Sequence, residues 1–288
     1  MKSKESEFFA RSKLLESLII VAISFGNASA WAAPKAELWA RWQKHDSTNR
    51  KTIDHYAWDN FLKQYVVAPH PSGINRVRYQ AVTPEDLKSL KKYLQEMQNI
   101  AISNYNREEQ KAYWINVYNA ATVDLILARF PVKSIRDVNI SPGFLARGPW
   151  GAKLFSAEGE RLSLDDMEHR ILRPIWKDNR VHYALNCASL GCPNLQPMAF
   201  TAENSETLLD RGAVDFINHP RGIAIQKGRL QVSSIYVWFQ EDFGGDAEEL
   251  MEHWQKYAHP PLAGALQKYS GGLAHDYDWR LNGIDEKP

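Results

Sequence analysis

The chain has 288 residues, of which 44% are apolar and ten are tryptophan, so it has enough apolar surface to form a folded core. Lys and Arg together number 35, Asp and Glu together number 34, and no long basic run interrupts this balance. A nucleic-acid-binding protein ordinarily carries a concentrated basic surface. Composition and charge therefore exclude a disordered chain, and we do not expect nucleic acid as a partner.

The start of the chain has the pattern of a secretory signal peptide over residues 1–30. Basic side chains precede the apolar run 14–25, which leads to Ala28-Ser29-Ala30. Signal peptidase cleaves after small residues in this arrangement, so we expect cleavage after Ala30. A retained amphipathic helix is the alternative, because an acidic residue lies inside the apolar run.

The apolar run is also too short for an ordinary membrane span, which needs ~18 continuous apolar residues, and no later segment approaches that length. We therefore expect an exported protein, either periplasmic or secreted, with no membrane span once the signal peptide is removed.

The first predicted elements are helices. Residues 31–55 are rich in Trp and charge and are expected to form an N-terminal extension. The amphipathic stretch 56–67 predicts a helix. Thr83 is a typical cap for the next helix, with Pro84 as its first residue. No repeat or linker interrupts residues 56–288, so we expect one globular domain there.

A central helix is predicted over residues 111–129. A capping-box pattern at 106–109 precedes it, and its apolar residues lie on all sides, which is typical of a helix buried on every face. Asn116 and Asn119 share a stripe with apolar residues, so each buried amide needs hydrogen-bond partners or costs about 1–3 kcal/mol. Those partners are either nearby backbone groups or other members of a functional site.

A shorter helix is predicted to follow Ser163, which is a typical cap, with Asp165 and Asp166 in the first turn. On a helical wheel Glu168 lies within the apolar face and His169 lies beside it. A buried carboxylate needs a partner. That partner is either a structural arginine or backbone N–H, or a group in a catalytic site.

Both cysteines of the chain, Cys187 and Cys192, lie in one loop. Residues 182–185 predict a short buried strand, and the turn-forming residues after it place both thiols at the strand's end. On an extended strand His182 lies up to ~16 Å from Cys187 and on the opposite face, so it meets Cys192 more easily. His169 is the other candidate base for Cys187.

The remaining sequence predicts alternating helices and strands. In chain order these are a helix from Thr201 or Asn204 to Ile217, a hairpin over 223–232, helices over 235–239 and 246–257 and after Pro260, and a strand over 277–281. The hairpin turns at Lys227-Gly228, and a capping box of Asp246 with Glu249 begins the helix over 246–257.

Four sequence blocks carry a resemblance to a known family. They are YWINVYNAAT at 113–122, LSLDDMEH at 162–169, HYALNCAS at 182–189 followed by Cys192-Pro193, and WFQEDF at 238–243. In this order they resemble the exported bacterial type of the family called domain of unknown function 547 (DUF547). The likeness extends from about Phe61 to Leu281. The family has no established activity, so the resemblance implies no reaction. Relatives with Ser in place of Cys192 imply that Cys187 is the more important thiol.

Several hypotheses remain open for the two thiols. The first is a Cys187–Cys192 disulfide, favoured by export into an oxidising compartment, although so short a loop gains only about 2 kcal/mol from closure. The second is a Cys187 nucleophile activated by His182 or His169, with Glu168, Asn116 or Asn119 as the orienting group. A metal site with His182 matches no standard zinc spacing, so no metal is expected. Two buried free thiols are the last alternative.

These observations predict an α/β (α+β) fold, a single helix-rich domain with a small central sheet, of the papain or transglutaminase kind. The expected function is a cysteine-dependent hydrolase or transferase that acts on an amide or peptide bond of a small molecule or peptide, with no cofactor. The alternative is a non-catalytic periplasmic binding protein with a structural disulfide. Because buried polar groups satisfy one another most cheaply in one network, we expect one cleft lined by Asn116, Asn119, Glu168, His182 and Cys187.

Overall fold

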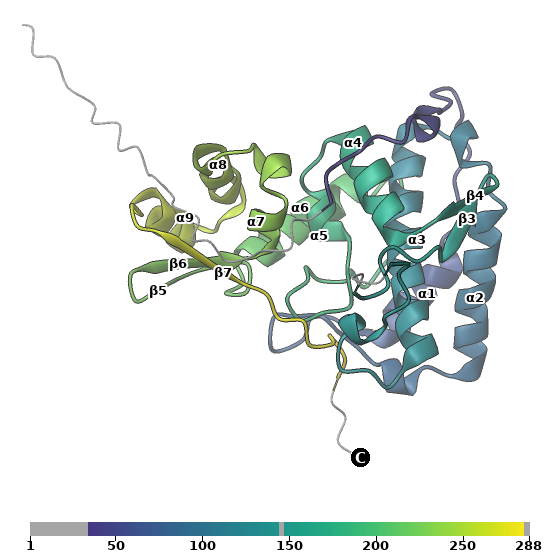
Figure 1. The fold of residues 1–288 in the computed structure, drawn as a ribbon, viewed down its shortest axis with the longest axis horizontal. Coiled ribbons are helices and arrows are strands. Elements are labelled where there is room, and N and C mark those ends of the chain that lie inside the picture. The colour runs from purple at the N-terminus through teal and green to yellow at the C-terminus, as the bar shows by residue number, and fades with distance from the viewer. Residues whose placement is uncertain (1–33, 144–146, 285–288) are drawn as a thin grey trace, which may run out of the picture.

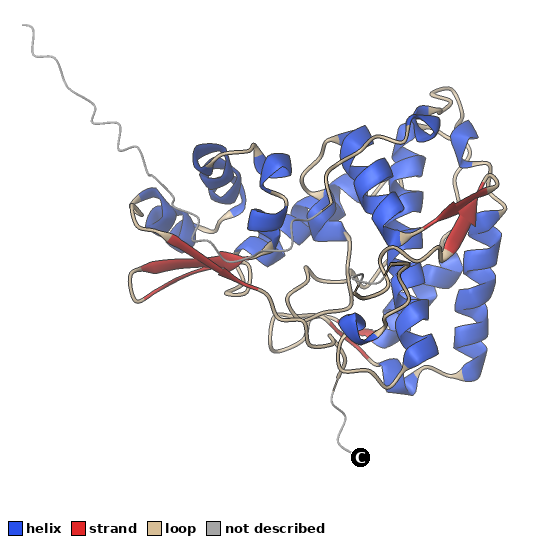
Figure 2. Cartoon of the chain, viewed as in Figure 1, coloured by secondary structure: helices blue, strands red, loops and turns tan. Residues whose placement is uncertain are grey.

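The computed structural model describes residues 34–143 and 147–284, so the predicted signal peptide lies outside the described residues. Figure 1 shows the path of the chain, and Figure 2 shows helices through most of the molecule with strands in small separate groups. The mixed helix-and-sheet class that the sequence predicts is therefore confirmed.

The N-terminal helices begin where their caps predict. They are α1 (Tyr56–Tyr65), α2 (Pro84–Gln98) and α3 (Arg107–Arg129). The Thr83 side chain accepts a hydrogen bond from the backbone of α2, and the Asn106 side chain does the same for α3 through Glu109 N–H. The predicted box at Asn106 forms on one side only, because the Glu109 carboxylate accepts the backbone N–H of Ile53 instead. That bond ties the extension before α1 to the start of α3.

Helix α3 is the centre of the larger apolar cluster, as the sequence predicts. Nearly every residue from Glu109 to Ile126 is buried, and Ala112, Ile115 and Ala120 have no exposed surface. Helix α2 and the helical segment after Ser163 both pack against α3. A helix covered on all sides has no polar face, and this accounts for apolar residues all round its sequence.

The segment after Ser163 is wound as a π-helix, η5 (Asp166–Leu172), which continues into α4 (Arg173–Trp176). Ser163 caps it as predicted, because its hydroxyl accepts Asp166 N–H while the Asp166 carboxylate accepts Ser163 N–H. The wider turn changes the position of each side chain from that on an α-helical wheel. His169 is consequently buried, whereas Glu168 is partly exposed.

The strand predicted over residues 182–185 is wrong, because these residues form the short helix α5 (Val181–Ala184). Its first turn is set by the preceding residues, where Asp178 accepts Val181 N–H on its backbone and binds Lys111 of α3 through its carboxylate. A short apolar run is compatible with either a strand or a buried helix. Here the ion pair between Lys111 and Asp178 fixes the preceding turn on α3, which favours the helix. Helix α5 packs on α6 (Ser205–Ile217).

The strands form three small sheets, and α3 rather than any of these sheets occupies the centre of the described residues. Strands β1 (Val66–Val67) and β2 (Arg76–Val77) pair antiparallel, as do β3 (Phe155–Ala157) and β4 (Glu160–Leu162). The third sheet consists of the predicted hairpin β5 (Ile223–Gln226) and β6 (Arg229–Ser233), with β7 (Leu273–Asp276) parallel to β6.

A second apolar cluster surrounds the last helices, which are α7 (Ile235–Trp238), α8 (Ala247–Tyr257) and α9 (Pro260–Gln267). Asp246 caps α8 as predicted. Tyr183 of α5 belongs to this cluster, whereas Val181 and Ala184 belong to the larger one. The cysteine loop therefore starts where the two clusters meet. The remaining short turns are 3-10 helices: η1 (Ala40–Gln43), η2 (Tyr79–Ala81), η3 (Ile102–Asn104), η4 (Ile135–Asp137) and η6 (Gln240–Phe243).

The strand predicted over residues 277–281 is also wrong, since β7 ends at Asp276. From there the chain runs back along the cysteine loop (Figure 1), and Ser189 and Leu281 form an isolated antiparallel bridge. Gly191 N–H donates to Asp278 O at 2.8 Å. A Cβ at Gly191 would lie 2.8 Å from the backbone nitrogen of Asp278, so only glycine allows this approach.

Candidate functional site

The cysteine loop is held by amide side chains. Asn119 of α3 donates to Ala184 O at 2.9 Å and accepts Asn186 N–H at 2.8 Å. Asn186 in turn donates to Pro193 O and accepts Ala188 N–H. Both ends of the loop and its first turn are thereby attached to the most buried helix, so the position of the thiols is set by the core.

The residue that follows Cys187 adopts a strained conformation. Ala188 has φ +58°, in the left-handed region that L-residues other than Asn, Asp and Gly rarely adopt. It is fully buried, and its N–H is held by Asn186. Such strain persists only where the surroundings enforce it, and it is concentrated at functional sites. The turn directs the Cys187 side chain toward Cys192 and Tyr277.

Three possible hydrogen-bond donors surround the sulfur of Cys187. Cys192 Sγ lies 3.0 Å away, Tyr277 Oη 3.0 Å and Ser189 Oγ 3.3 Å. Both thiols are free in this structure. Cys187 is partly exposed, whereas Cys192 is buried and accepts Cys187 N–H at 2.9 Å. The more accessible thiol is thus the one with three side-chain donors around it.

These contacts shift the pKa values of the two thiols in opposite directions. The hydrogen bond from Cys192 lowers the pKa of Cys187, and Ser189 and Tyr277 lower it further, against the opposite effect of burial. Burial and the neighbouring Cys187 raise the pKa of Cys192 well above its ordinary value. Cys187 is therefore the thiol that ionises, and the thiolate is the nucleophilic form of cysteine.

A second polar cluster is formed by His182, Asp242 and Arg173. His182 Nε2 donates to Asp242 Oδ2 at 2.6 Å, and Arg173 Nε donates to the same oxygen. The ring of His182 stacks on Phe239 with centroids 4.2 Å apart. Burial alone would raise the pKa of Asp242, but His182 and Arg173 lower it to about 2. The carboxylate therefore stays ionised and accepts hydrogen bonds from both side chains.

His169 and Glu168 of η5 border this cluster. Arg173 Nη1 donates to His169 Nδ1 at 3.0 Å, and burial lowers the pKa of His169, so its ring is held neutral. Glu168 Oε1 lies 3.7 Å from His182 Nδ1, and Glu168 Oε2 accepts the Tyr118 hydroxyl. The two histidines and Glu168 thus lie in one polar cluster.

The two clusters are neighbours without direct contact. The charge of Glu168 raises the pKa of Cys187, and both Glu168 and Cys187 act on Tyr118, whose pKa burial raises well above its ordinary value. Among residues 34–143 and 147–284, no hydrogen bond joins His169 or His182 to Cys187.

The remaining predicted site residue, Asn116, lies in a different contact. Its amide donates to Phe200 O at 2.7 Å and accepts Phe200 N–H at 3.0 Å. Asn116 and Asn119 therefore both bind backbone, which is the structural alternative stated for them from the sequence. Asn119 supports the cysteine loop, whereas Asn116 anchors the chain before α6.

The sequence interpretation did not include Tyr277, Ser189, Asp242 or Arg173 in the site. Asp242 lies in the last of the four family-like blocks, so its position in that block could have indicated it. Ser189 lies two residues after Cys187 in the third block. Tyr277 is 90 residues from Cys187, and no pattern in the sequence relates the two.

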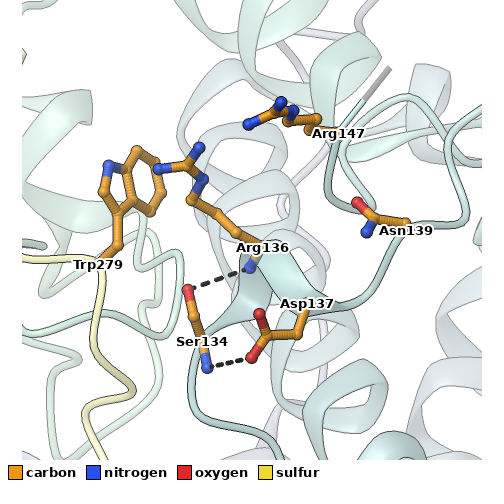
Figure 3. Close-up of a pocket in the computed structure, with 6 residues that line it drawn as sticks. All are labelled: Ser134, Arg136, Asp137, Asn139, Arg147 and Trp279. Atoms are coloured by element: carbon orange, nitrogen blue, oxygen red, sulfur yellow. Dashed lines mark hydrogen bonds between the residues drawn. The ribbon is translucent and has the colours of Figure 1, made fainter. Parts of the chain in front are cut away.

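An aromatic surface adjoins the thiols. Tyr277 packs on Trp279 and Trp238, and Trp279 packs on Trp150, with centroids 4.5 to 5.7 Å apart. All four rings are partly exposed. Trp279 also borders an open depression of about 620 Å³, and Figure 3 shows the Arg136 side chain against its ring. The other lining residues are Ser134, Asp137, Asn139 and Arg147. Partly exposed aromatic rings beside polar groups are typical of ligand-binding surfaces.

Within the described part of the chain, no group of three or more His, Cys, Asp or Glu is arranged to hold a metal ion. No helix in the same residues is long and apolar enough to cross a membrane.

Comparison with known proteins identifies a family for the middle of the chain. Residues 102–217 match the model of the family described as protein of unknown function, DUF547, and this match places them in that family. The match contains the first three family-like blocks and both cysteines, whereas the block at 238–243 lies beyond it. No curated protein and no solved structure matches the chain.

Proposed function

The family to which residues 102–217 belong has no assigned activity, and we propose from the geometry of the cysteine loop that this protein is a cysteine-dependent hydrolase or acyltransferase. Its substrate is a small molecule or peptide with an amide or peptide bond. The single observation that carries the proposal is the environment of Cys187 Sγ, which is partly exposed and has Cys192, Tyr277 and Ser189 as hydrogen-bonding neighbours.

The proposed reaction begins with attack of the Cys187 thiolate on the substrate carbonyl carbon. The sulfur–carbon bond forms, and the carbonyl π electrons move to the oxygen. The electrons on that oxygen then re-form the carbonyl, and the carbon–nitrogen bond breaks. The amine departs with a proton from the Tyr277 hydroxyl, and the acyl group remains bound to Cys187 as a thioester. Water, or an amine in a transfer reaction, then attacks the thioester and gives its proton to the Tyr277 oxygen, which restores the thiolate.

Tyr277 is suited to this role by its contact with the sulfur. Burial and then the charges of Cys187 and Cys192 raise the pKa of Tyr277 well above its ordinary value, so the hydroxyl is protonated while the thiolate is present. Acylation removes the negative charge of Cys187, and the pKa of Tyr277 then falls toward its ordinary value. Proton donation is therefore favoured at the step that needs it.

His182 and His169 have a supporting role in this proposal. Arg173 and Asp242 hold their rings, and Glu168 lies between His182 and Tyr118. The cluster fixes η5 and α5 relative to each other, and its charge acts on Cys187 only through space.

The test is alkylation and turnover in matched variants. Iodoacetamide should modify Cys187 faster than an ordinary thiol at neutral pH, because the thiolate is the reacting form. Cys187→Ser should abolish hydrolysis across a panel of peptide p-nitroanilides while the fold persists, and Cys192→Ser should retain it. Equal losses of melting temperature in both variants, with no free thiol in the native protein, would contradict the proposal and indicate a structural disulfide.

A binding protein is the second candidate, and the partly exposed aromatic surface of Trp150, Trp238, Tyr277 and Trp279 favours it. Tryptophan and tyrosine faces bury much area with little loss of side-chain freedom. If binding is the function, Cys187→Ser should bind peptides or glycans with unchanged affinity, whereas Trp279→Ala should bind them more weakly. Calorimetric titration of both variants separates the two candidates.

We also propose that the protein is exported and acts in the periplasm or outside the cell. The basic start, the apolar run and Ala28-Ser29-Ala30 support this. N-terminal sequencing of the protein from the periplasm and medium should find a chain that begins near Trp31. A chain that still begins at Met1 would contradict the proposal.

A further inference from the structure

The two thiols are arranged as a reactive pair. Their sulfurs lie 3.0 Å apart without a bond. A disulfide requires about 2.05 Å, so an approach of about 1 Å would close it. Both residues belong to one tight loop, in which Cys192 N–H donates to Ser189 O at 3.2 Å. No rearrangement between distant elements is needed for the two sulfurs to meet.

The pair is asymmetric in access. Cys187 is partly exposed, whereas Cys192 is buried beneath it with 4% of its surface exposed. Cys192 Sγ is held from two sides, by Cys187 N–H at 2.9 Å and by Leu185 O at 3.7 Å. A dissolved disulfide can therefore reach Cys187 first, and Cys192 can act only on what has already bonded to Cys187.

We propose that Cys187 and Cys192 form a dithiol–disulfide couple that exchanges with small-molecule disulfides, with Cys187 as the attacking thiol and Cys192 as the resolving thiol. In the first step the Cys187 thiolate attacks one sulfur of the disulfide, a mixed disulfide forms and one thiolate leaves. In the second step Cys192 loses its proton and attacks Cys187 Sγ, the protein disulfide forms and the second thiolate leaves. Counted from the dithiol, the protein pair loses two electrons and two protons, one from Cys187 when it ionises and one from Cys192. The two departing thiolates take up these protons, so the small disulfide is reduced to two thiols.

The neighbouring charges favour this order. The pKa of Cys192 is raised by burial and by the negative charge of Cys187. Once Cys187 is in a mixed disulfide that charge is gone, so Cys192 ionises more readily at the moment when its attack is required. Tyr277 and Ser189 stabilise Cys187 as the first thiolate. Tyr277 also acts on Cys192, but burial and Cys187 outweigh it and keep the pKa of Cys192 raised.

The couple would also regulate the proposed acyl chemistry, and this part of the inference rests on the proposed function. In the disulfide, Cys187 Sγ is bonded to Cys192 Sγ and is no longer a thiolate, so the oxidised protein cannot attack the carbonyl and form a thioester. The exchange itself requires no acyl substrate and can be measured without one.

The experiment exposes the reduced full-length protein to oxidised glutathione and follows intact mass and free thiols. The wild type should lose both thiols and retain no glutathione, and dithiothreitol should restore both. Cys192→Ser should stop with one bound glutathione. Cys187→Ser should lose its remaining thiol at least about tenfold more slowly, because Cys192 is buried and not acidic. Acid quenching of the wild type at short times should trap the mixed disulfide at Cys187, which tests the order without any substitution.

Different outcomes separate this inference from the proposed function. The couple is overturned if the wild type retains glutathione while Cys192 remains a thiol, or if Cys187→Ser reacts as fast as the wild type. If exchange proceeds as described but no p-nitroanilide is cleaved, the couple stands and the hydrolase proposal fails. If amide cleavage occurs and oxidised glutathione does not inhibit it, the hydrolase stands and the couple fails. Ser89→Ala, at an exposed serine of α2, keeps both thiols and their neighbours, so it is the control for the substitutions and should still close the disulfide.

Discussion

The hydroxyl oxygen of Tyr277 lies 3.0 Å from the sulfur of Cys187, although 90 residues separate them in the sequence. Tyr277 follows β7, and the chain after it pairs with the cysteine loop through Gly191, Leu190 and Ala188. The C-terminal segment therefore completes the surroundings of a thiol that the middle of the chain presents.

Tyr277→Phe should slow alkylation of Cys187 at pH 7 by about tenfold, because a hydrogen bond to a charged group is worth about 1.5–3 kcal/mol and its loss raises the thiol pKa. The measurement is the rate of iodoacetamide modification as a function of pH, whose midpoint should move upward. Tyr56→Phe, at an exposed tyrosine, is the control and should leave the profile unchanged. An unaltered midpoint in Tyr277→Phe would show that Tyr277 does not stabilise the thiolate.

Asn119→Ala should lower the free energy of unfolding by about 3 kcal/mol, since it leaves a buried carbonyl and a buried N–H of the cysteine loop without their partners. Urea unfolding measures this change. Asn104→Ala removes an exposed amide and should change stability by less than about 0.5 kcal/mol. Equal effects of the two substitutions would mean that Asn119 does not hold the loop.

Asp242→Asn should lower the free energy of unfolding by about 3 kcal/mol, because it leaves the buried guanidinium of Arg173 without its anion. Glu241→Gln, at the exposed neighbouring position, is the control for lost charge. Asp242→Asn also tests the role of His182, because it removes the carboxylate that His182 binds. The rate of alkylation at Cys187 in Asp242→Asn should stay within about twofold of the wild-type rate. A large fall in that rate would identify His182 as the base that forms the thiolate.

Stability should fall as the pH drops from about 6.5 toward 4. Burial lowers the pKa of His55 from 6.5 to about 4, so between these values the unfolded chain binds a proton that the folded chain does not. The contribution is fully present above pH 6.5 and decreases by about 3 kcal/mol by pH 4. His55→Gln should reduce the loss of unfolding free energy between pH 7 and pH 4.5, and His45→Gln, at an exposed histidine, should not. Identical pH slopes in His55→Gln and the wild type would contradict this assignment.

Local patterns in the sequence determined the helices correctly wherever the whole signal is contained in neighbouring residues. Thr83 and Asp246 cap their helices as predicted, and the apolar residues on all sides of α3 indicate a helix buried throughout. The hairpin of β5 and β6 follows from its turn at Lys227-Gly228. Caps, turns and periodicity act over a few residues, so one sequence is sufficient to recognise them.

Tertiary contacts decided the conformation of the residues around the thiols. Residues 181–184 are mostly apolar, and so short a run is compatible with a strand. The ion pair between Lys111 and Asp178 attaches the preceding turn to α3, which favours a helix. A single sequence contains no information on that partner, because 67 residues separate the two ends of the pair.

The sequence likewise predicted only some of the residues of the candidate site. The sequence drew attention to Cys187, His182 and Glu168 as polar groups in apolar surroundings, and burial of such groups is a local inference. Which of them touch was settled by packing: His182 binds Asp242, and Cys187 lies beside Tyr277. The hydrogen-bond partners of buried groups depend on how distant segments of the chain pack together, so only the tertiary structure shows them.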